Sequence, residues 1–342
     1  MPERRTRQVV ILFLLILLVG AAAVLLVPHL TGTGGAPQAR QGWGVLRPPG
    51  DVEALVIQGD RVIAGGSDGI VVLDRSNGQP VDDSLTALPV GRVQALLLDR
   101  NGSLWIGHET GLTRVTGSVV MLFDTTSGLP AGEVLSLMED REGRVWAGTW
   151  KGASVQNGER WRVLTRDDGL LDNNVHAMRE DRNGGIWFGS YVAPRGGVSY
   201  LRDGRWQHFT REHGLPHPNV VAFLQDRDGS VWAGTGLIDR GGAARFVEKE
   251  GTWSIAETLT AADGLAGNKV RALFQDRDGV LWFGSEYDGL ARKGETGWQV
   301  FTDKDGLANN EVKCIVQDPD GDLWIGTRNG ITRIRARALH AP

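Results

Sequence analysis

The most regular feature of the sequence is a pair of apolar segments joined by a short turn rich in Asp and Gly. Its clearest copy is Glu133–Thr149 (EVLSLMEDREGRVWAGT), in which Val134–Glu139 alternates apolar and polar residues and Asp140–Gly143 forms the turn. Glycine supplies the positive φ angle that a tight hairpin turn needs. Similar apolar patterns follow, so this part of the chain predicts four strands, at Val134–Glu139, Arg144–Thr149, Gly152–Gln156 and Trp161–Thr165.

The same frame recurs around six tryptophans, Trp105, Trp146, Trp187, Trp232, Trp282 and Trp324. Each has an aspartate six positions before it, a glycine three before, a valine twelve before and a second glycine two after. Successive tryptophans are 41, 41, 45, 50 and 42 residues apart, which is the period of a β-propeller blade. A degenerate seventh unit has Ile63 at the tryptophan position. We therefore predict an all-β fold, a seven-bladed β-propeller with four strands in each blade.

The ends of the repeat array predict how the ring closes. Outer strands of the form W-x-x-x-T occur at Trp161–Thr165, Trp206–Thr210 and Trp298–Thr302, but the last unit has no such segment. A similar segment, Trp43–Arg47, precedes the first unit instead. We expect it to supply the outer strand of the last blade and to cover that sheet edge, so that the propeller domain spans residues 42–338.

The start of the chain has a different composition. Val9–Val27 contains no charged residue over 19 positions, and Arg4, Arg5 and Arg7 precede it. This length fits one transmembrane helix, and the positive-inside rule places the N-terminus in the cytoplasm. We predict a cytoplasmic stub and membrane anchor over residues 1–30, a linker over residues 31–41, and a single-pass protein of the cell membrane whose propeller is extracytoplasmic. The alternative is a cleaved signal peptide, for which Ala21–Ala23 offers small residues at the cleavage site.

Composition excludes some classes of function. The formal net charge is −4 and no basic stripe occurs in the repeats, so nucleic acid is not an expected partner. The single cysteine, Cys314, excludes an intramolecular disulfide. It occupies a position where other units have alanine or serine, and we expect a packed, unreactive thiol there.

The repeat unit, with its W-x-x-F-T strand and its D-G-L crossing at Asp168–Leu170, Asp263–Leu265 and Asp305–Leu307, resembles the two-component regulator propeller repeat. The resemblance covers residues 42 to about 336. It implies an extracytoplasmic ligand-sensing propeller, because such propellers belong to sensors, often carbohydrate-responsive, that continue into a β domain, a membrane helix and a histidine kinase. Here the predicted membrane helix precedes the propeller, so we do not expect this chain to be a self-contained sensor kinase.

Two groups of repeated residues could suggest chemistry. The turns at Asp226–Gly229, Asp276–Gly279 and Asp318–Asp322 resemble the opening of a calcium loop, but the glutamate that would close such a loop is replaced by Thr235, Ser285 and Thr327. We therefore expect these aspartates to accept backbone hydrogen bonds within their turns, and we expect the tryptophans to pack between blades. Neither a metal nor a cofactor is predicted.

An enzyme is the less favoured prediction. Virginiamycin B lyase is a propeller of similar units, and activity of that type would need a histidine acid/base pair with a metal on the channel face. His176 and His217 are the histidines to test, but no local spacing marks such a pair or a metal motif.

Function is expected where the repeats differ, in the loops between the second and third strands, which share one face with the crossings between blades. The candidate ligand-binding residues are His108, Glu109, Trp150, Lys151, Tyr191, Arg195, Glu286, Tyr287, Arg328 and Asn329. Aromatic rings among them could stack on sugars, and the charged groups could bind polar substituents. The sequence predicts a non-catalytic, sensor-type propeller that binds a glycan or another polar small molecule. Alternatively, it is an accessory or scaffold subunit of a membrane protein complex.

Overall fold

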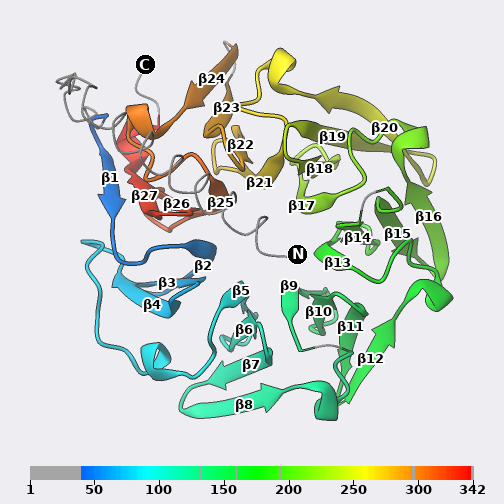
Figure 1. Cartoon of the computed structure of the whole chain (residues 1–342), viewed down its shortest axis with the longest axis horizontal. Coiled ribbons are helices and arrows are strands. Elements are labelled where there is room, and N and C mark those ends of the chain that lie inside the picture. Colours follow the sequence, from blue (N-terminus) through cyan, green and yellow to red (C-terminus); the bar gives the residue numbers. More distant parts are fainter. Residues whose placement is uncertain (1–39, 131, 159, 193, 295–296, 340–342) are drawn as a thin grey trace, which may run out of the picture. The chain divides into compact units, whose positions relative to one another are not determined.

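The computed structural model describes residues 40–339 apart from 131, 159, 193 and 295–296, and it shows seven antiparallel sheets arranged radially (Figure 1). The first blade contains β2 (Val52–Gln58), β3 (Arg61–Gly66) and β4 (Gly69–Asp74). The second contains β5 (Val93–Leu98), β6 (Leu104–His108), β7 (Gly111–Thr116) and β8 (Val119–Phe123), and the third β9 (Val134–Glu139), β10 (Val145–Thr149), β11 (Gly152–Asn157) and β12 (Arg160–Leu164). The fourth contains β13 (Val175–Glu180), β14 (Ile186–Ser190), β15 (Val198–Arg202) and β16 (Arg205–Phe209).

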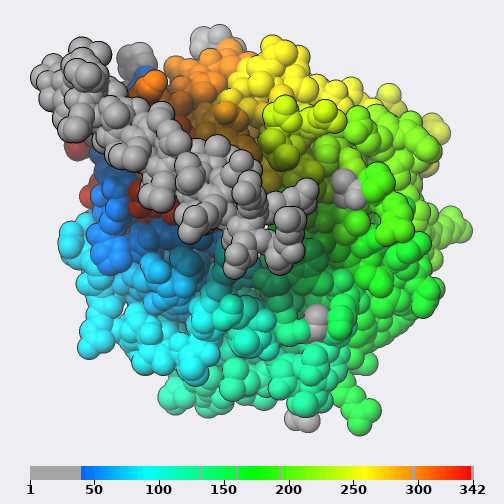
Figure 2. Space-filling view, in the orientation of Figure 1, coloured from blue at the N-terminus to red at the C-terminus, as the bar shows by residue number. Residues whose placement is uncertain are grey.

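The remaining blades follow the same order around the ring. The fifth blade contains β17 (Val220–Gln225), β18 (Val231–Leu237), β19 (Arg240–Lys249) and β20 (Thr252–Leu259). The sixth contains β21 (Val270–Gln275), β22 (Leu281–Ser285), β23 (Leu290–Gly294) and β24 (Gly297–Phe301), and the seventh β25 (Val312–Gln317), β26 (Leu323–Thr327), β27 (Gly330–Ile334) and β1 (Trp43–Leu46). The prediction of an all-β, seven-bladed propeller is confirmed. Side chains fill the space between neighbouring blades (Figure 2).

The first blade differs from the prediction of four strands, because its sheet has three. After β4 the chain makes only an isolated bridge between Leu73 and Pro80. Two backbone hydrogen bonds flank this bridge, from Asp74 N–H to the carbonyl of Gln79 (2.8 Å) and from Val81 N–H to that of Val72 (3.0 Å), so a fourth strand begins but is not continued. A 3₁₀ turn at Ser84–Ala87, capped by Asp83, then leads to the second blade.

The last blade is completed by the N-terminal strand. Strand β1 pairs antiparallel with β27 from Trp43 opposite Ile334 to Leu46 opposite Ile331. The Trp43 ring lies 5.2 Å from that of Phe301 in the neighbouring blade. The predicted membrane helix at Val9–Val27 and most of the predicted linker lie outside the described residues. Within the described residues, no helix is long and apolar enough to span a membrane.

The repeated aspartate and tryptophan form one local hydrogen-bonded unit. In the third blade, the buried carboxylate of Asp140 accepts hydrogen bonds from the backbone N–H groups of Glu142 (3.0 Å) and Arg144 (2.9 Å) and from the indole Nε1 of Trp146 (2.8 Å). The equivalent indole–carboxylate bonds are 2.8–3.1 Å in four other blades and 3.5 Å between Trp232 and Asp226. The predicted role of these aspartates within their turns is confirmed.

The arginine that follows the aspartate connects neighbouring blades. Each guanidinium donates to a backbone carbonyl in the turn of the next blade, at 2.8–3.0 Å, from Arg100, Arg141, Arg182, Arg227 and Arg277. In the seventh blade Pro319 occupies this position, and the contact with the first blade is made instead by Arg75, 2.5 Å from Asp320. The same arginine contact therefore joins each pair of neighbouring blades from the second to the seventh. A different contact joins the seventh blade to the first.

The D-G-L crossings are short capped turns. In Thr165–Leu170, the backbone N–H of Thr165 donates to the carboxylate of Asp168 (2.8 Å), which caps the 3₁₀ turn Arg166–Asp168. Gly169 has a φ of 117°, and a Cβ there would lie 2.3 Å from the indole nitrogen of Trp206. Leu170 is buried. Each residue of the motif therefore has a structural role, and the crossing brings the chain back to the channel at the start of the next inner strand.

Candidate functional site

The inner strand of every blade contains a β-bulge at the same position. In β5, Val93 pairs with His108 and Ala95 with Gly107, so Gln94 between them has no partner. The same shift occurs in the other six inner strands. Bulges re-aim a side chain, and here the bulge residue lines the central channel. The seven residues, which we call the bulge ring, are Glu53, Gln94, Leu135, His176, Val221, Arg271 and Lys313.

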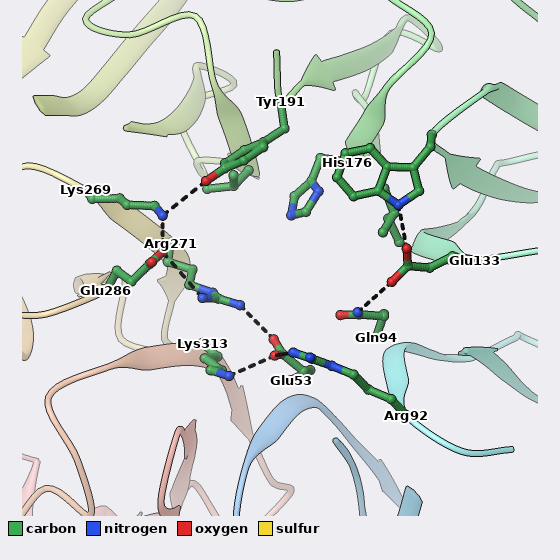
Figure 3. Close-up of a pocket in the computed structure, with 13 residues that line it drawn as sticks. Glu53, Arg92, Gln94, Glu133, His176, Tyr191, Lys269, Arg271, Glu286 and Lys313 are labelled. Atoms are coloured by element: carbon green, nitrogen blue, oxygen red, sulfur yellow. Dashed lines mark hydrogen bonds and ion pairs between the residues drawn. The ribbon is translucent and has the colours of Figure 1, made fainter. Parts of the chain in front are cut away.

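The bulge ring forms the base of a cavity of about 310 Å³ at one mouth of the channel (Figure 3). Other lining residues come from the starts of inner strands and from loops between second and third strands: Arg92, Glu133, Trp150, Tyr191, Lys269 and Glu286. Beyond the bulge ring the channel is lined mainly by apolar side chains, among them Leu55, Met178 and Phe223. The channel therefore becomes apolar below the polar base of the cavity.

One wall of the cavity is a network of ion pairs centred on Glu53. Its carboxylate accepts from Arg92 (2.9 Å), Arg271 (2.8 Å) and Lys313 (2.8 Å), which come from three other blades (Figure 3). Burial alone would raise the pKa of Glu53, but the positive charges of Arg271 and Lys313 hold that pKa below its ordinary value. Glu53 is therefore ionised at neutral pH and links the first blade to the second, sixth and seventh.

Two further carboxylates extend this wall. Arg271 also contacts Glu311 at 2.9 Å and Glu286 at 3.4 Å. Glu286 pairs with Lys269, whose ammonium group lies 3.3 Å from the hydroxyl of Tyr191. Because these groups are largely buried and paired, they hold the walls of the cavity in place before any ligand arrives.

The opposite wall carries no charge apart from Glu133. It consists of Leu135 and Val221 together with the rings of Trp150, His176 and Tyr191. The His176 and Tyr191 rings stack with centroids 5.0 Å apart. Trp150 donates to Glu133 at 2.5 Å, and Gln94 donates to the other oxygen of Glu133 at 3.0 Å. The cavity therefore presents aromatic faces on one side and charged groups on the other.

His176 is neutral at physiological pH. Desolvation lowers its pKa to about 4 and the positive charge of Arg271 adds to the shift, although Glu53 and Glu286 oppose it. Its Nδ1 atom is buried without a hydrogen-bond partner among the described residues. A neutral imidazole carries one N–H and one acceptor nitrogen, so Nε2 of His176 can donate to or accept from a ligand, depending on the tautomer.

The depressed pKa of His176 predicts a pH-dependent stability. The ordinary pKa is 6.5, so between pH 6.5 and 4 the unfolded chain binds a proton that the folded chain does not. The free energy of unfolding should therefore fall as the pH drops through this window, by roughly 2 kcal/mol at pH 5. Replacing His176 by glutamine should remove this contribution, so urea denaturation at pH 7.5 and pH 5.0 should show a smaller acid-induced loss in H176Q than in the wild type. Equal losses in the two proteins would contradict the shift.

The structure brings together three of the residues that the sequence nominated, since Trp150, Tyr191 and Glu286 all line the cavity. Tyr287 and Arg328 stand at its rim: the Tyr287 hydroxyl donates to Glu286 (2.9 Å), and Arg328, largely exposed, lies 3.5 Å from Glu311. Lys151 and Arg195 are exposed and do not line the cavity.

The other three nominated residues have different surroundings. His108 is 2% exposed, and its ring nitrogens lie 3.0 Å from the hydroxyls of Thr110 and Thr113, so it is held inside the second blade rather than offered to a ligand. Asn329 accepts from Arg47 (2.8 Å to its carbonyl) next to the closing strand. Glu109 lines a separate depression between the first and second blades.

Sequence reasoning missed most of the bulge ring. The residues missed directly follow the repeated valine, in a strand whose repeated pattern we attributed to folding alone: Glu53, Gln94, Arg271 and Lys313. A signal was present, because this position holds seven different residue types in seven units while the valine before it never changes. Among the histidines of the described residues, His176 lines the cavity and His217 does not. In the same part of the chain, no three His, Cys, Asp or Glu side chains are grouped as metal ligands would be.

Comparison with known proteins agrees with the repeat and the fold. The two component regulator propeller repeat matches six times, at residues 87–110, 128–151, 169–192, 214–236, 264–287 and 306–329. A search of curated proteins gave no match.

Among solved structures, the extracellular domain of BT3049 from B. thetaiotaomicron, named as a hybrid two component system, is 19% identical with a TM-score of 0.74, over 88% of this chain and 42% of that one. The extracellular domain of BT4673 from the same organism is 18% identical with a TM-score of 0.68, over 86% of this chain and 40% of that one. This chain thus spans about two fifths of those domains. The virginiamycin B lyase of Staphylococcus aureus, solved with quinupristin, is 13% identical with a TM-score of 0.65, over 85% of this chain and 98% of that one.

Proposed function

Because the chain belongs to the two component regulator propeller repeat family, we propose that it is a non-catalytic, sensor-type propeller that binds a polar ligand in the cavity at the channel mouth. The observation that carries this proposal is the bulge ring. Seven structurally equivalent positions carry seven different side chains, and they converge on one cavity whose size is at the lower end of the range of small-molecule sites. Positions that serve only the fold, such as the preceding valine, do not vary in this way.

The location of the propeller is part of the proposal. The structures compared above include extracellular domains of proteins named as a hybrid two component system and a one component system, which supports an extracytoplasmic propeller. The uncharged segment Val9–Val27 would anchor it in the cell membrane. The chemistry of the lining suits a glycan, because Trp150 and Tyr191 could stack on sugar rings and the charged groups of the ion-pair wall could bind sugar hydroxyls.

Filling the cavity tests this function. Val221 lines the cavity, whereas Val300 is 44% exposed on the outer strand β24. We expect melting of the full-length protein in detergent to shift upward with at least one member of a panel of sugars, amino acids and organic acids. V221W should abolish that shift and V300W should preserve it. A shift that survives in V221W would place binding elsewhere, and the absence of any shift across the panel would count against a small-molecule ligand.

A second candidate function, an accessory or docking subunit, is favoured by the hairpin tip between β18 and β19. Leu237 and Ile238 are 37% and 65% exposed there, and Ile238 has a φ of 57°, which is unfavourable for a β-branched residue. Strain of this kind tends to be kept at functional positions. Mild-detergent purification of the full-length protein should then yield a stoichiometric partner that is lost in a variant with Ile238→Asn and Leu237→Ser. A monomeric species without companions would argue against this candidate.

A further inference from the structure

The carboxylates that line the cavity already have hydrogen-bond partners. Glu53 accepts from three cations, and Glu286 pairs with Lys269. Glu133 accepts from Trp150 at one oxygen and Gln94 at the other. A cationic ligand would have to break these contacts to find an anionic partner, which would leave buried cations unpaired at a high cost.

The unused polar groups of the cavity are mainly donors. Arg92 contacts carboxylates only through Nη2, so its Nε and Nη1 have no partner among the described residues. The Tyr191 hydroxyl accepts from Lys269, which leaves its own proton free. His176 makes no hydrogen bond to any described residue and carries one N–H. Against these donors, the side-chain oxygen of Gln94 is a free acceptor, whereas Nδ1 of His176 is buried.

The net charge around the cavity is close to balanced. Four cations line the cavity (Arg92, Lys269, Arg271 and Lys313) against three carboxylates (Glu53, Glu133 and Glu286). Asp51 and Glu311 contact Lys313 and Arg271 from outside the lining, and these two carboxylates more than offset the excess of one positive charge. The preference for an anion therefore depends on the free donors of Arg92 and not on the net charge of the cavity.

We propose that the ligand of this cavity carries a carboxylate, which Arg92 binds. The Tyr191 hydroxyl and His176, on the other side of the cavity, bind an uncharged polar group of the ligand, and its body lies against Trp150, Leu135 and Val221 (Figure 3). The inference rests on the proposed ligand-binding function and narrows it to acids. Charge-assisted hydrogen bonds of a carboxylate to arginine are about twice as strong as neutral ones, so the acid should be preferred over its neutral counterpart. A sugar acid and the C-terminus of a peptide share this chemistry.

The test uses two matched pairs of probes on full-length protein in detergent at constant ionic strength. The first pair is glucuronate and glucose, and the second is N-benzoylglycine and its amide. Calorimetric titration should show binding of at least one acid with an affinity ten or more times that of its neutral counterpart. Glucuronate binding would identify a sugar acid as the source, and N-benzoylglycine binding would identify an acylated amino acid or peptide end.

Variants locate the carboxylate. Arg92→Gln should weaken acid binding about tenfold or more and leave binding of the neutral counterpart nearly unchanged, whereas Tyr191→Phe should weaken binding of acid and neutral counterpart alike. Arg205→Gln, at an exposed arginine on the outer strand β16, should change neither. Tyr191→Phe keeps the ring and the stacking on His176. If Arg92→Gln fails to fold, the ratio of acid to neutral affinity in the wild type still tests the proposal.

Three outcomes would overturn the inference. Equal binding of acid and neutral counterpart, or binding of glucose alone, would reject the carboxylate and leave the proposed binding function standing. Acid binding that is unaffected in Arg92→Gln would place the carboxylate elsewhere. In the third outcome, none of the four probes binds, but other compounds of the panel bind to the wild type and not to V221W. This result would reject acids as the ligand class and retain the cavity as the binding site.

Discussion

Removing the N-terminal strand is expected to lower the free energy of unfolding by about 4 kcal/mol. Strand β1 contributes the Trp43 ring against Phe301 and the partly buried side chain of Leu46, and burial of two large apolar side chains is worth roughly this amount. Its loss would also uncover Ile331 and Ile334, which are now completely buried, and leave β27 as an open sheet edge. Urea denaturation of a chain that starts at residue 48 should show the loss.

The matched control for this experiment starts at residue 40 and retains β1. It should unfold at a urea concentration close to that of the full-length protein, because the contacts of β1 with β27 remain. The truncated chain, in contrast, should also self-associate through the uncovered edge, which light scattering would detect. If both chains unfolded at the same urea concentration, the closing strand would contribute nothing measurable to stability.

Replacing Asp140 by alanine is expected to lower the free energy of unfolding by about 3 kcal/mol. The carboxylate is 1% exposed and accepts from two backbone N–H groups and the Trp146 indole, and each buried donor left without a partner costs about 1–3 kcal/mol. Chemical denaturation of D140A at pH 7 measures the loss. Asp82→Ala, at an exposed aspartate, is the control and should change stability by less than about 0.5 kcal/mol.

The pH dependence of the stability difference between wild type and D140A tests the role of the ionised carboxylate. Burial would raise the pKa of Asp140, but hydrogen bonds from Trp146 and Arg144 hold it below the ordinary value of 3.8. Asp140 therefore stabilises the fold fully at neutral pH, and its contribution is lost as the pH falls below 3.8 toward the folded-state pKa. The difference between wild type and D140A should narrow in that acid range. A difference that stays constant would show that the ionised form is not what the turn requires.

Sequence patterns predicted only part of the candidate site. Trp150, Tyr191 and Glu286 could be nominated because they stand in loops that vary between repeats. Lys151 and Arg195 stand in the same loops but are exposed and away from the cavity, and the direction of a loop side chain depends on packing that no periodicity encodes. His108 occupies the last position of β6, where the hydroxyls of Thr110 and Thr113 hold its ring inside the blade.

By itself, the sequence determined the blade, because the contacts that define a blade are local. Asp140 and Trp146 are six residues apart, and the turn between them gives both partners their geometry within one hairpin. Only the tertiary structure decided the binding cavity. Glu53 meets Arg271 and Lys313 across 218 and 260 residues of sequence, and the three side chains converge only because seven blades close into a ring and the bulge in each inner strand turns one residue toward the channel.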